Sequence, residues 1–231
     1  MCGRFNSIAS GKDFASVYDA QFLTDELLPN FNVAPTTLVY VLHRQDGERV
    51  LDAMSWGLVP SWSKDKTRAA SMINARSETL TEKPSFRNLV SEHRCVLPIQ
   101  GFYEWQNLPS ETKKPRKQAH YISRVDERPM TLAGLWTIWR QPDSSLLRTC
   151  TIITTDANEK LSPIHHRMPV ILERDSVEIW LGESKALPND LLIAAKNEIV
   201  MSEPTSRLDR ASNASNSSTA QLDDDSSGRL F

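Results

Sequence analysis

The first residues of the chain carry its most unusual chemistry. The sequence begins Met1-Cys2-Gly3-Arg4, and cells usually remove an initiator methionine when a small residue such as Cys2 follows it. Cys2 would then carry a free α-amine and a thiol on adjacent carbons, and both groups are nucleophiles once they are deprotonated. Such an aminothiol can condense with an aldehyde, first to a Schiff base and then to a five-membered thiazolidine ring. Taken by itself, a cysteine that happens to fall at position 2 is the simpler interpretation.

Two other stretches carry groups that can move protons. Residues 101–105 read Gly-Phe-Tyr-Glu-Trp, so Glu104 lies among aromatic side chains, where desolvation is expected to raise its pKa. A carboxyl group with a raised pKa can accept and donate protons near neutral pH. Residues 163–169 carry His165, a second histidine and Arg167 between two prolines, and a neutral imidazole suits proton transfer at pH 7. A surface glutamate and a structural loop with solvated histidines are the alternatives.

Polar and aromatic residues in two further regions suit contacts to a nucleic acid. In Ile73-Asn74-Ala75-Arg76, the Asn74 amide can hold a carbonyl or hydroxyl group, and Arg76 can grip a phosphate with two parallel hydrogen bonds. Pro35 and Trp62 lie in turn-like segments, and such side chains can stack on bases or wedge between them. A structural pair and a loop tryptophan used for packing are the corresponding alternatives.

The bulk composition is that of an ordinary globular protein. The 231 residues are 39% hydrophobic and 24% charged, which allows one large domain or two small ones. No run approaches the length of a membrane span and the N-terminus lacks the apolar segment of a signal peptide, so we expect a cytoplasmic protein that does not contact membranes. The net charge of -2 does not indicate nucleic-acid binding, although a local basic groove is compatible with it.

The cysteines and histidines give no sign of a metal site. Cys95 and Cys150 lie in strand-like apolar stretches, where buried, reduced thiols are expected. No Cys-x-x-Cys pair or His/Cys cluster is present, and the adjacent pair of histidines lacks a third ligand at a suitable spacing. We therefore expect neither a metal nor another cofactor.

The hydrophobic pattern predicts mixed strands and helices without a regular βαβ period, which favours the α+β class. An Asp-Gly turn at residues 45–48 predicts a hairpin. Strands are predicted at 38–42, 50–56, 94–99, 120–124, 130–139, 147–155 and 170–172, and helices at 12–22, 84–93, 156–162, 175–181 and 189–197. From about Ser202 the chain is rich in Ser, Asn and Asp, so we predict a folded domain over 1–201 and a disordered tail over 202–231.

Six stretches along the chain together resemble one protein family. In order they are residues 1–5 (MCGRF), 32–35 (NVAP), 56–62 (WGLVPSW), 73–79 (INARSET), 101–105 (GFYEW) and 164–169 (IHHRMP). This set, which runs from Met1 to about Leu181, resembles the SRAP family (SOS-response-associated peptidase), whose members are abasic-site processing proteins. The C-terminus departs from the family pattern, because residues 204–209 only weakly resemble the Val-Ser-containing strand that usually closes its members.

The resemblance implies a fold and an activity. It implies a single α+β domain with a curved, barrel-like, mostly antiparallel sheet flanked by short helices. It also implies binding to single-stranded DNA, especially near junctions with duplex, and a covalent crosslink between Cys2 and the aldehyde of an abasic site. The catalytic residues it implies are Cys2, Asn74, Glu104 and His165, and the DNA-binding residues are Arg4, Pro35, Trp62, Arg76 and Arg167. A monomer that associates with the nucleoid, removes its own Met1 and has lyase-like chemistry at abasic sites is the matching expectation.

Two other functions remain compatible with the sequence. A cysteine peptidase or an N-terminal-nucleophile amidase would use Cys2 as nucleophile, His165 as base and Asn74 as the residue that orients the base. A DNA-binding module without covalent chemistry is the third interpretation.

Overall fold

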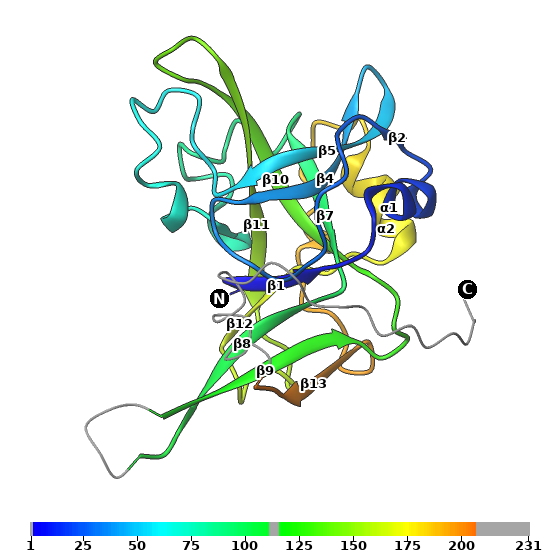
Figure 1. Ribbon diagram of the computed structural model, residues 1–231, viewed down its shortest axis with the longest axis vertical. Helices are drawn as coiled ribbons and strands as arrows, with labels where there is room; N and C mark the ends of the chain where they lie inside the picture. The colour runs from blue at the N-terminus through cyan, green and yellow to red at the C-terminus, as the bar shows by residue number, and fades with distance from the viewer. Residues whose placement is uncertain (1, 111–115, 207–231) are drawn as a thin grey trace, which may run out of the picture.

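Five long strands close into a barrel at the centre of the molecule (Figure 1). The computed structural model describes residues 2–110 and 116–206. The barrel strands are β4 (Leu38–Gln45), β5 (Glu48–Trp56), β7 (Arg94–Ile99), β10 (Met130–Arg140) and β11 (Leu146–Asp156). They pair in the order β11-β10-β7-β4-β5, and a parallel pairing of β11 with β5 closes the ring. The other pairings within the ring are antiparallel.

A second, antiparallel sheet of five strands lies below the barrel in Figure 1. Its order is β13 (Val200–Pro204), β9 (Arg116–Arg124), β8 (Gly101–Leu108), β1 (Arg4–Ser7) and β3 (Asn30–Val33). Strand β8 follows the barrel strand β7 after a single residue, so the chain passes directly from one sheet into the other. Because β1 pairs with β8 and also contacts β7, this junction places β1 next to the barrel.

Short elements extend the barrel sheet and cover its outside. Strands β6 (Asn74–Arg76) and β12 (Arg167–Pro169) both pair with β11, and β2 (Gln21–Phe22) pairs with β5. Helices α1 (Gly11–Tyr18) and α2 (Arg174–Leu181) lie side by side against the barrel wall (Figure 1). Short 3₁₀ turns occupy Ala69–Ser71 (η1), Ser77–Thr79 (η2) and Asn189–Leu191 (η3).

The apolar core divides along the barrel wall. Alternate residues of the barrel strands point inward, as the period of two in a strand requires, and they join Cys2 and Phe5 in one cluster. The inward residues on β4, β5 and β11 are Val39, Val41, Met54, Trp56, Cys150 and Ile152. The outward residues pack beneath α1 and α2, where Phe14, Tyr18 and Trp180 are buried. Cys2 is therefore part of the interior cluster and does not lie on the outer surface.

The predicted class, the barrel-like sheet and the Asp-Gly hairpin are confirmed, but several predicted helices are wrong. The helix predicted over 12–22 ends at Tyr18, because Asp19 adopts a left-handed conformation (φ 49°) that terminates it. Residues 84–93 form separate turns, because the backbone N–H groups of Phe86 and Leu89 bond only three residues back and no continuous helical ladder forms in this segment. Residues 156–162 are turns held by the Asn158 side chain, which accepts a hydrogen bond from Leu161 N–H at 2.9 Å.

The predicted helix over 189–197 shrinks to the single turn of η3, and the strand predicted over 170–172 is displaced. The strand that forms there is β12, three residues earlier, while Ile171 makes only an isolated bridge to Leu132. A local apolar pattern does not fix which three residues meet β11, so tertiary pairing sets the boundary.

The last strand crosses the predicted end of the folded domain. Strand β13 pairs with β9 and continues to Pro204, so the chain is ordered into the sheet beyond residue 201. Val200 is fully buried, and the Ser202 hydroxyl lies within hydrogen-bond distance of His120. The sequence did not indicate this short strand, because the tail as a whole is polar in composition. Residues 207–231 of the predicted tail lie outside the described residues, and the rest of the domain division stays a prediction. No helix among the described residues is both long and apolar enough to span a bilayer.

Candidate active site

Cys2 lies at the mouth of the barrel with its side chain fully buried. Strand β1 runs antiparallel to β8 with Arg4 opposite Tyr103, so the residues just before Arg4 lie alongside those just after Tyr103. The Cys2 carbonyl oxygen accepts a hydrogen bond of 2.8 Å from Asn74 Nδ2 on β6. Two separate elements, β8 and β6, therefore fix the start of the chain.

Glu104 is buried beside Cys2, with 4% of its surface exposed. It shares a face of β8 with Phe102, whose ring belongs to the interior cluster. Burial raises the pKa of the Cys2 thiol well above its usual range, and the nearby Glu104 carboxylate raises that pKa further. The thiol is therefore protonated at neutral pH.

His165 comes from the loop between β11 and β12. Its ring stacks on that of His166, with centroids 4.4 Å apart, and its Nδ1 accepts a hydrogen bond of 2.9 Å from the Arg167 backbone N–H. Burial lowers the pKa of His165, and the Glu104 carboxylate opposes this shift. Glu104, His165 and Arg167 also line one small hollow, whose other walls are apolar. The charge of Glu104 thus acts on both the thiol and the imidazole.

Asn74 links Cys2 to a larger cleft. The parallel pairing of β6 with β11 places Asn74 opposite Ile152 and Arg76 opposite Thr154. Asn74 uses Nδ2 to hold Cys2, and its Oδ1 is buried with no hydrogen-bond partner among the described residues. Because Asn74 and Arg76 are two residues apart on a strand, their side chains share a face.

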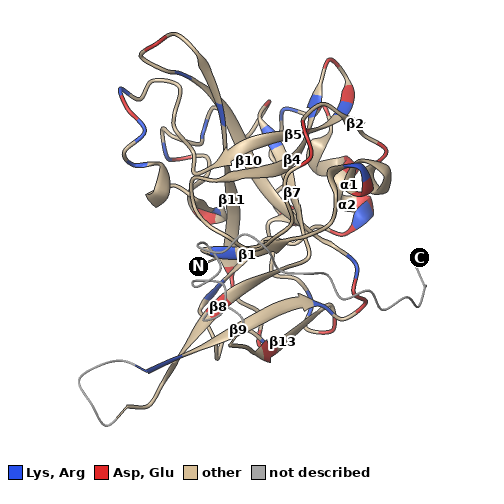
Figure 2. Ribbon diagram, viewed as in Figure 1, with Lys and Arg blue, Asp and Glu red and all other residues tan. Residues whose placement is uncertain are grey.

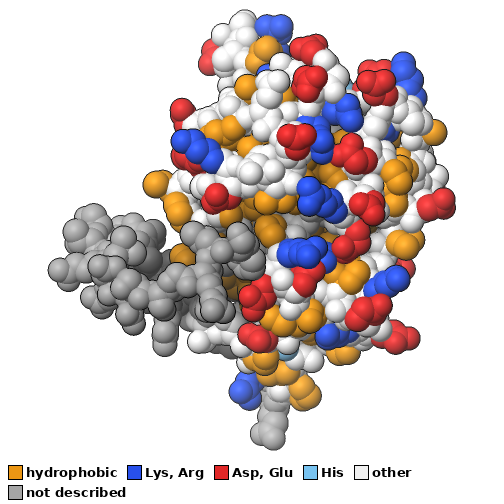
Figure 3. Space-filling view, turned by 90° about the vertical axis from the view of Figure 1, so that its right-hand side faces the viewer, with side chains coloured by type: hydrophobic (Ala, Val, Ile, Leu, Met, Phe, Trp, Pro, Cys, Tyr) orange, Lys and Arg blue, Asp and Glu red, His pale blue; other side chains and the backbone are white. Residues whose placement is uncertain are grey.

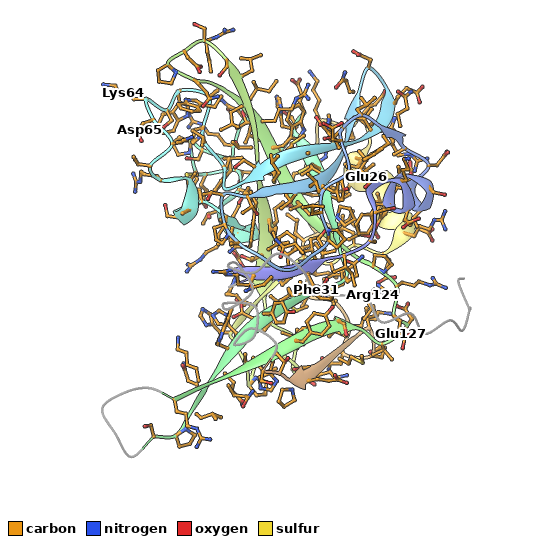
Figure 4. All side chains as sticks on the ribbon, in the orientation of Figure 1. Glu26, Phe31, Lys64, Asp65, Arg124 and Glu127 are labelled. Atoms are coloured by element: carbon orange, nitrogen blue, oxygen red, sulfur yellow. The ribbon has the colours of Figure 1, made fainter. Side chains whose placement is uncertain are left out.

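That face forms part of a cleft of about 580 Å³. Trp62, 66% exposed, stands in its wall, and the lining includes three cationic residues (Arg68, Arg76 and Lys83) against one acidic residue, Asp65. Figure 4 shows Lys64 and Asp65 on the projecting loop that follows Trp62, and Figure 2 shows Lys and Arg positions in blue along the ribbon of the same loop. Figure 3 shows a different face, where acidic and basic side chains are interspersed. Cationic residues therefore predominate in the lining of the cleft that Asn74 adjoins.

The loop of Pro35 is attached to the start of the Trp62 loop. Pro35 is half-buried, and the next residue, Thr36, has a positive φ of 68°. The Thr36 N–H donates to the Trp56 carbonyl oxygen at 2.7 Å, and the Trp56 N–H donates to the Thr37 carbonyl oxygen at 2.9 Å. The two predicted DNA-facing loops therefore leave the barrel from the same point.

The two remaining predicted arginines have different surroundings. Arg4 is half-buried, and its guanidinium donates to Asn32 Oδ1 on β3 at 3.3 Å. Arg167 is only 6% exposed, and its guanidinium binds the carboxylates of Glu78 and Asp156 at 2.6–2.9 Å. Two carboxylates that reach the surface therefore pair with Arg167, and its role as a phosphate ligand stays a prediction.

Sequence reasoning missed the residues that support the site from behind. Glu78 stands inside the stretch 73–79, but no local signal connects it to an arginine 89 positions away. On the second sheet, His120 lies opposite Glu104 in the β8–β9 register and contacts Ser202 Oγ at 3.0 Å and Gln106 Oε1 at 3.2 Å. These contacts depend on strand register, which the sequence does not display.

Comparisons with known proteins cover the whole of this arrangement. The pattern of the SOS response associated peptidase (SRAP) family matches residues 1–208. Abasic site processing protein YoqW of Bacillus subtilis (strain 168) is 39% identical over 193 residues, which are 83% of this chain and 84% of that protein. Abasic site processing protein HMCES of Xenopus tropicalis is 34% identical over 200 residues, covering 73% of this chain and 58% of that protein. A crystal structure from Bacteroides thetaiotaomicron superposes with a TM-score of 0.79 at 28% identity, covering 88% of this chain and 91% of that one.

Proposed function

The chain belongs to the SRAP family, and from that premise we propose that it processes abasic sites in single-stranded DNA through a covalent bond to Cys2. The observation that carries the proposal is the setting of Cys2, whose carbonyl is held by Asn74 and whose thiol feels the charge of the buried Glu104. The names of the relatives supply the substrate class, an abasic site. Such a site presents an aldehyde in its ring-opened form, which is the partner that an aminothiol requires.

The reaction begins once Met1 has been removed, by the protein itself in our proposal, because only then does Cys2 carry the α-amine. The amine adds to the aldehyde carbon, C1′ of the opened sugar, and loss of water gives a Schiff base. The thiol then adds across the C=N bond: sulfur bonds to C1′, and the thiol proton passes to the nitrogen. The product is a thiazolidine that covers the lesion.

Glu104 and His165 supply the proton transfers. Glu104 accepts the thiol proton and delivers it to nitrogen, because its charge acts directly on the thiol. His165 donates a proton to the sugar oxygen that leaves C1′ on ring opening, and the same step in reverse assists release. Asn74 orients Cys2 through Nδ2, and its buried Oδ1 accepts a hydrogen bond from a sugar hydroxyl.

The cleft beside Asn74 binds the DNA strand. Arg76 and the other cations of its lining hold phosphates, and the exposed Trp62 stacks on a base. Arg4 lies on the opposite side of Cys2 and holds a phosphate there. Pro35 and Trp62 leave the barrel together, so they meet the end of a duplex at a single-strand junction. The protein acts on this DNA as a monomer associated with the nucleoid.

A thiolate-based peptidase has less support in the geometry. A cysteine nucleophile of that class needs a lowered pKa, which a cationic or helix N-terminal setting provides. Burial and the Glu104 carboxylate both raise the pKa of the Cys2 thiol instead. His165 already uses Nδ1 as an acceptor from Arg167, so a Cys-His pair would have to use the other ring nitrogen.

The test is adduct formation with a single-stranded oligonucleotide that carries one abasic site. We expect a denaturant-stable species with the mass of protein plus DNA less one water, absent with intact DNA and in Cys2→Ala. The matched control is Cys95→Ala, which removes another fully buried thiol from the same apolar cluster and should leave the adduct unchanged. A wild-type protein without Met1 that forms no adduct would refute the proposal. Cleavage of peptide substrates by a protein that makes no adduct would favour the peptidase.

A further inference from the structure

An ion cluster stands directly behind His165, formed by the buried Arg167 guanidinium and two carboxylates that reach the surface. The Arg167 guanidinium donates from Nη1 to Glu78 Oε1 at 2.7 Å and to Asp156 Oδ1 at 2.6 Å. Its Nη2 donates to Glu78 Oε2 at 2.9 Å and to the Thr154 carbonyl oxygen at 2.8 Å. Glu78 therefore makes a two-pronged contact, which fixes the guanidinium in direction as well as in position.

The backbone of the same arginine contacts His165. The Arg167 N–H lies 2.9 Å from Nδ1 of His165, and the Arg167 carbonyl oxygen lies 3.1 Å from the same nitrogen. The N–H can only donate, so that contact requires a lone pair on Nδ1 and a neutral ring whose proton is on Nε2. The carbonyl oxygen can only accept, so the second contact requires a proton on Nδ1. A small change at Arg167 thus decides which contact is made.

We propose that Glu78 is a positioning residue for His165: by holding the Arg167 guanidinium, it aims the Arg167 N–H at Nδ1 and keeps the proton of the neutral ring on Nε2. Asp156 supports the same position, because it lies opposite Arg167 in the β11–β12 register. The cluster holds β12 against β11 and η2, and His165 lies two residues before Arg167. The inference rests on the proposed role of His165 as a proton donor to the sugar.

The tautomer of the neutral His165 ring distinguishes the effect of Glu78 from simple electrostatics. The groups that act on the pKa of the ring are Glu104 on β8, the charge of the N-terminus, the neighbouring His166 and the Arg167 backbone, whose hydrogen bond raises that pKa. Glu78 and Asp156 lie behind Arg167. Removing the Glu78 charge alone would lower the pKa of His165 and leave the tautomer of the neutral ring unchanged. Loosening the Arg167 N–H contact would instead let the proton of the neutral ring move from Nε2 to Nδ1.

The experiment follows the ring nitrogens of His165 by ¹⁵N NMR against pH in the full-length protein, with the resonances assigned from a His165→Gln spectrum. In wild type we expect Nδ1 to be an unprotonated acceptor and Nε2 to be protonated at pH 7.5. In Glu78→Gln we expect Nδ1 of the neutral ring to gain protonated character at pH 7.5. Glu78→Asp, which keeps the carboxylate, should restore most of the wild-type signature.

The matched control is Glu178→Gln. Glu178 on α2 also binds an arginine, with Oε1 2.6 Å from Arg49 Nη1, but this pair lies on the outer surface away from His165. The control should change neither the ring signature nor crosslink formation. An unchanged tautomer of the neutral His165 ring in Glu78→Gln, whatever the shift in its pKa, overturns the proposal.

Crosslink kinetics give the second readout. A misdirected imidazole should slow crosslink formation by Glu78→Gln roughly tenfold to hundredfold, the cost of misplacing a catalytic group by about 1 Å. The two proposals fail separately. A wild-type protein that makes no adduct contradicts the proposed function while the ring signature still tests Glu78. An active wild type with an unaltered ring signature and rate in Glu78→Gln contradicts the role of Glu78 alone.

Discussion

Replacing Asn74 with alanine should slow crosslink formation while the protein stays folded. The side chain contributes one hydrogen bond of 2.8 Å to the Cys2 carbonyl oxygen, and no other contact to that oxygen is expected to replace it. A net hydrogen bond is worth about 1 kcal/mol, and a buried carbonyl left without a donor costs about 1–3 kcal/mol. If this free energy orients the aminothiol in the transition state, the rate should fall by about fivefold to 150-fold.

Asn74→Asp sharpens the prediction because it keeps the size of the side chain. A carboxylate offers no donor to the Cys2 carbonyl and places a second anion near Glu104, so its rate should fall at least as far as that of Asn74→Ala. The assay is single-turnover adduct formation on denaturing gels at saturating DNA, with thermal unfolding measured on the same samples. Gln141→Ala is the control, since it removes an amide hydrogen bond of 2.7 Å in the β10–β11 hairpin, away from Cys2.

Two results would refute this reasoning. An Asn74→Ala protein that forms the adduct at the wild-type rate would show that the Cys2 carbonyl does not need its donor. A wild-type rate at saturating DNA together with a weaker affinity for undamaged single-stranded DNA would assign Asn74 to binding rather than to orientation.

Three further predictions address the cleft and the barrel. Trp62→Ala should weaken binding of single-stranded DNA by about 1–3 kcal/mol, the free energy of stacking one base on an aromatic ring, without changing Tm. Fluorescence anisotropy measures the binding, and thermal unfolding scans measure Tm. Arg94→Met should lower the free energy of unfolding by about 3 kcal/mol in urea titrations. The reason is that the buried guanidinium donates hydrogen bonds to five backbone carbonyls, at the end of α2 and before β7. A loss below about 1 kcal/mol would contradict this prediction. Burial lowers the pKa of both His43 and His93, which pack on Trp136, so the unfolded chain binds the extra protons. The stability that their neutral rings contribute is complete above the unfolded pKa of about 6.5 and is lost as the pH falls below that value. Replacing both histidines with Gln should therefore reduce the pH dependence of the urea-unfolding midpoint between pH 7.5 and 5.5.

The strands of the barrel could be predicted because each carries its own signal. The β4–β5 hairpin has an Asp-Gly turn in which Asp46 and Gly47 both take positive φ, at 52° and 84°, so the local sequence and the fold require the same conformation. The segment 84–93 shows the opposite case. Its helix-like pattern gives separate turns, in which Phe86 and Leu89 bond only three residues back, and the Arg94 guanidinium binds the carbonyl oxygens of Val90 and Ser91 at the end of the segment. A tertiary contact of this kind leaves no trace in a short window of sequence.

The residue types of the site could be predicted, but their bonds could not. The short motifs identified Asn74 and Glu104, and the structure places both beside Cys2. The partner of each depends on pairings such as β6 with β11, between segments 78 positions apart. Arg167 illustrates the limit. Its type suggested a phosphate ligand, which stays a prediction, but its pairing with Asp156 follows from the register of β12 with β11 and could not be predicted from local sequence.

The burial of Cys2 constrains the order of the chemical steps. A fully buried thiol beside a carboxylate resists ionisation, because two anions in one apolar site repel each other and neither is well solvated. In the proposed reaction the thiol is thus a poor first nucleophile, and the amine attacks the aldehyde first. A protonated Schiff base would then add a cation to the site, and this cation would offset the negative charge formed when the thiol proton passes to Glu104. The carboxylate that suppresses the thiolate before the lesion arrives would therefore be the base for ring closure, and the thiol would react only with an aldehyde already bound to the amine.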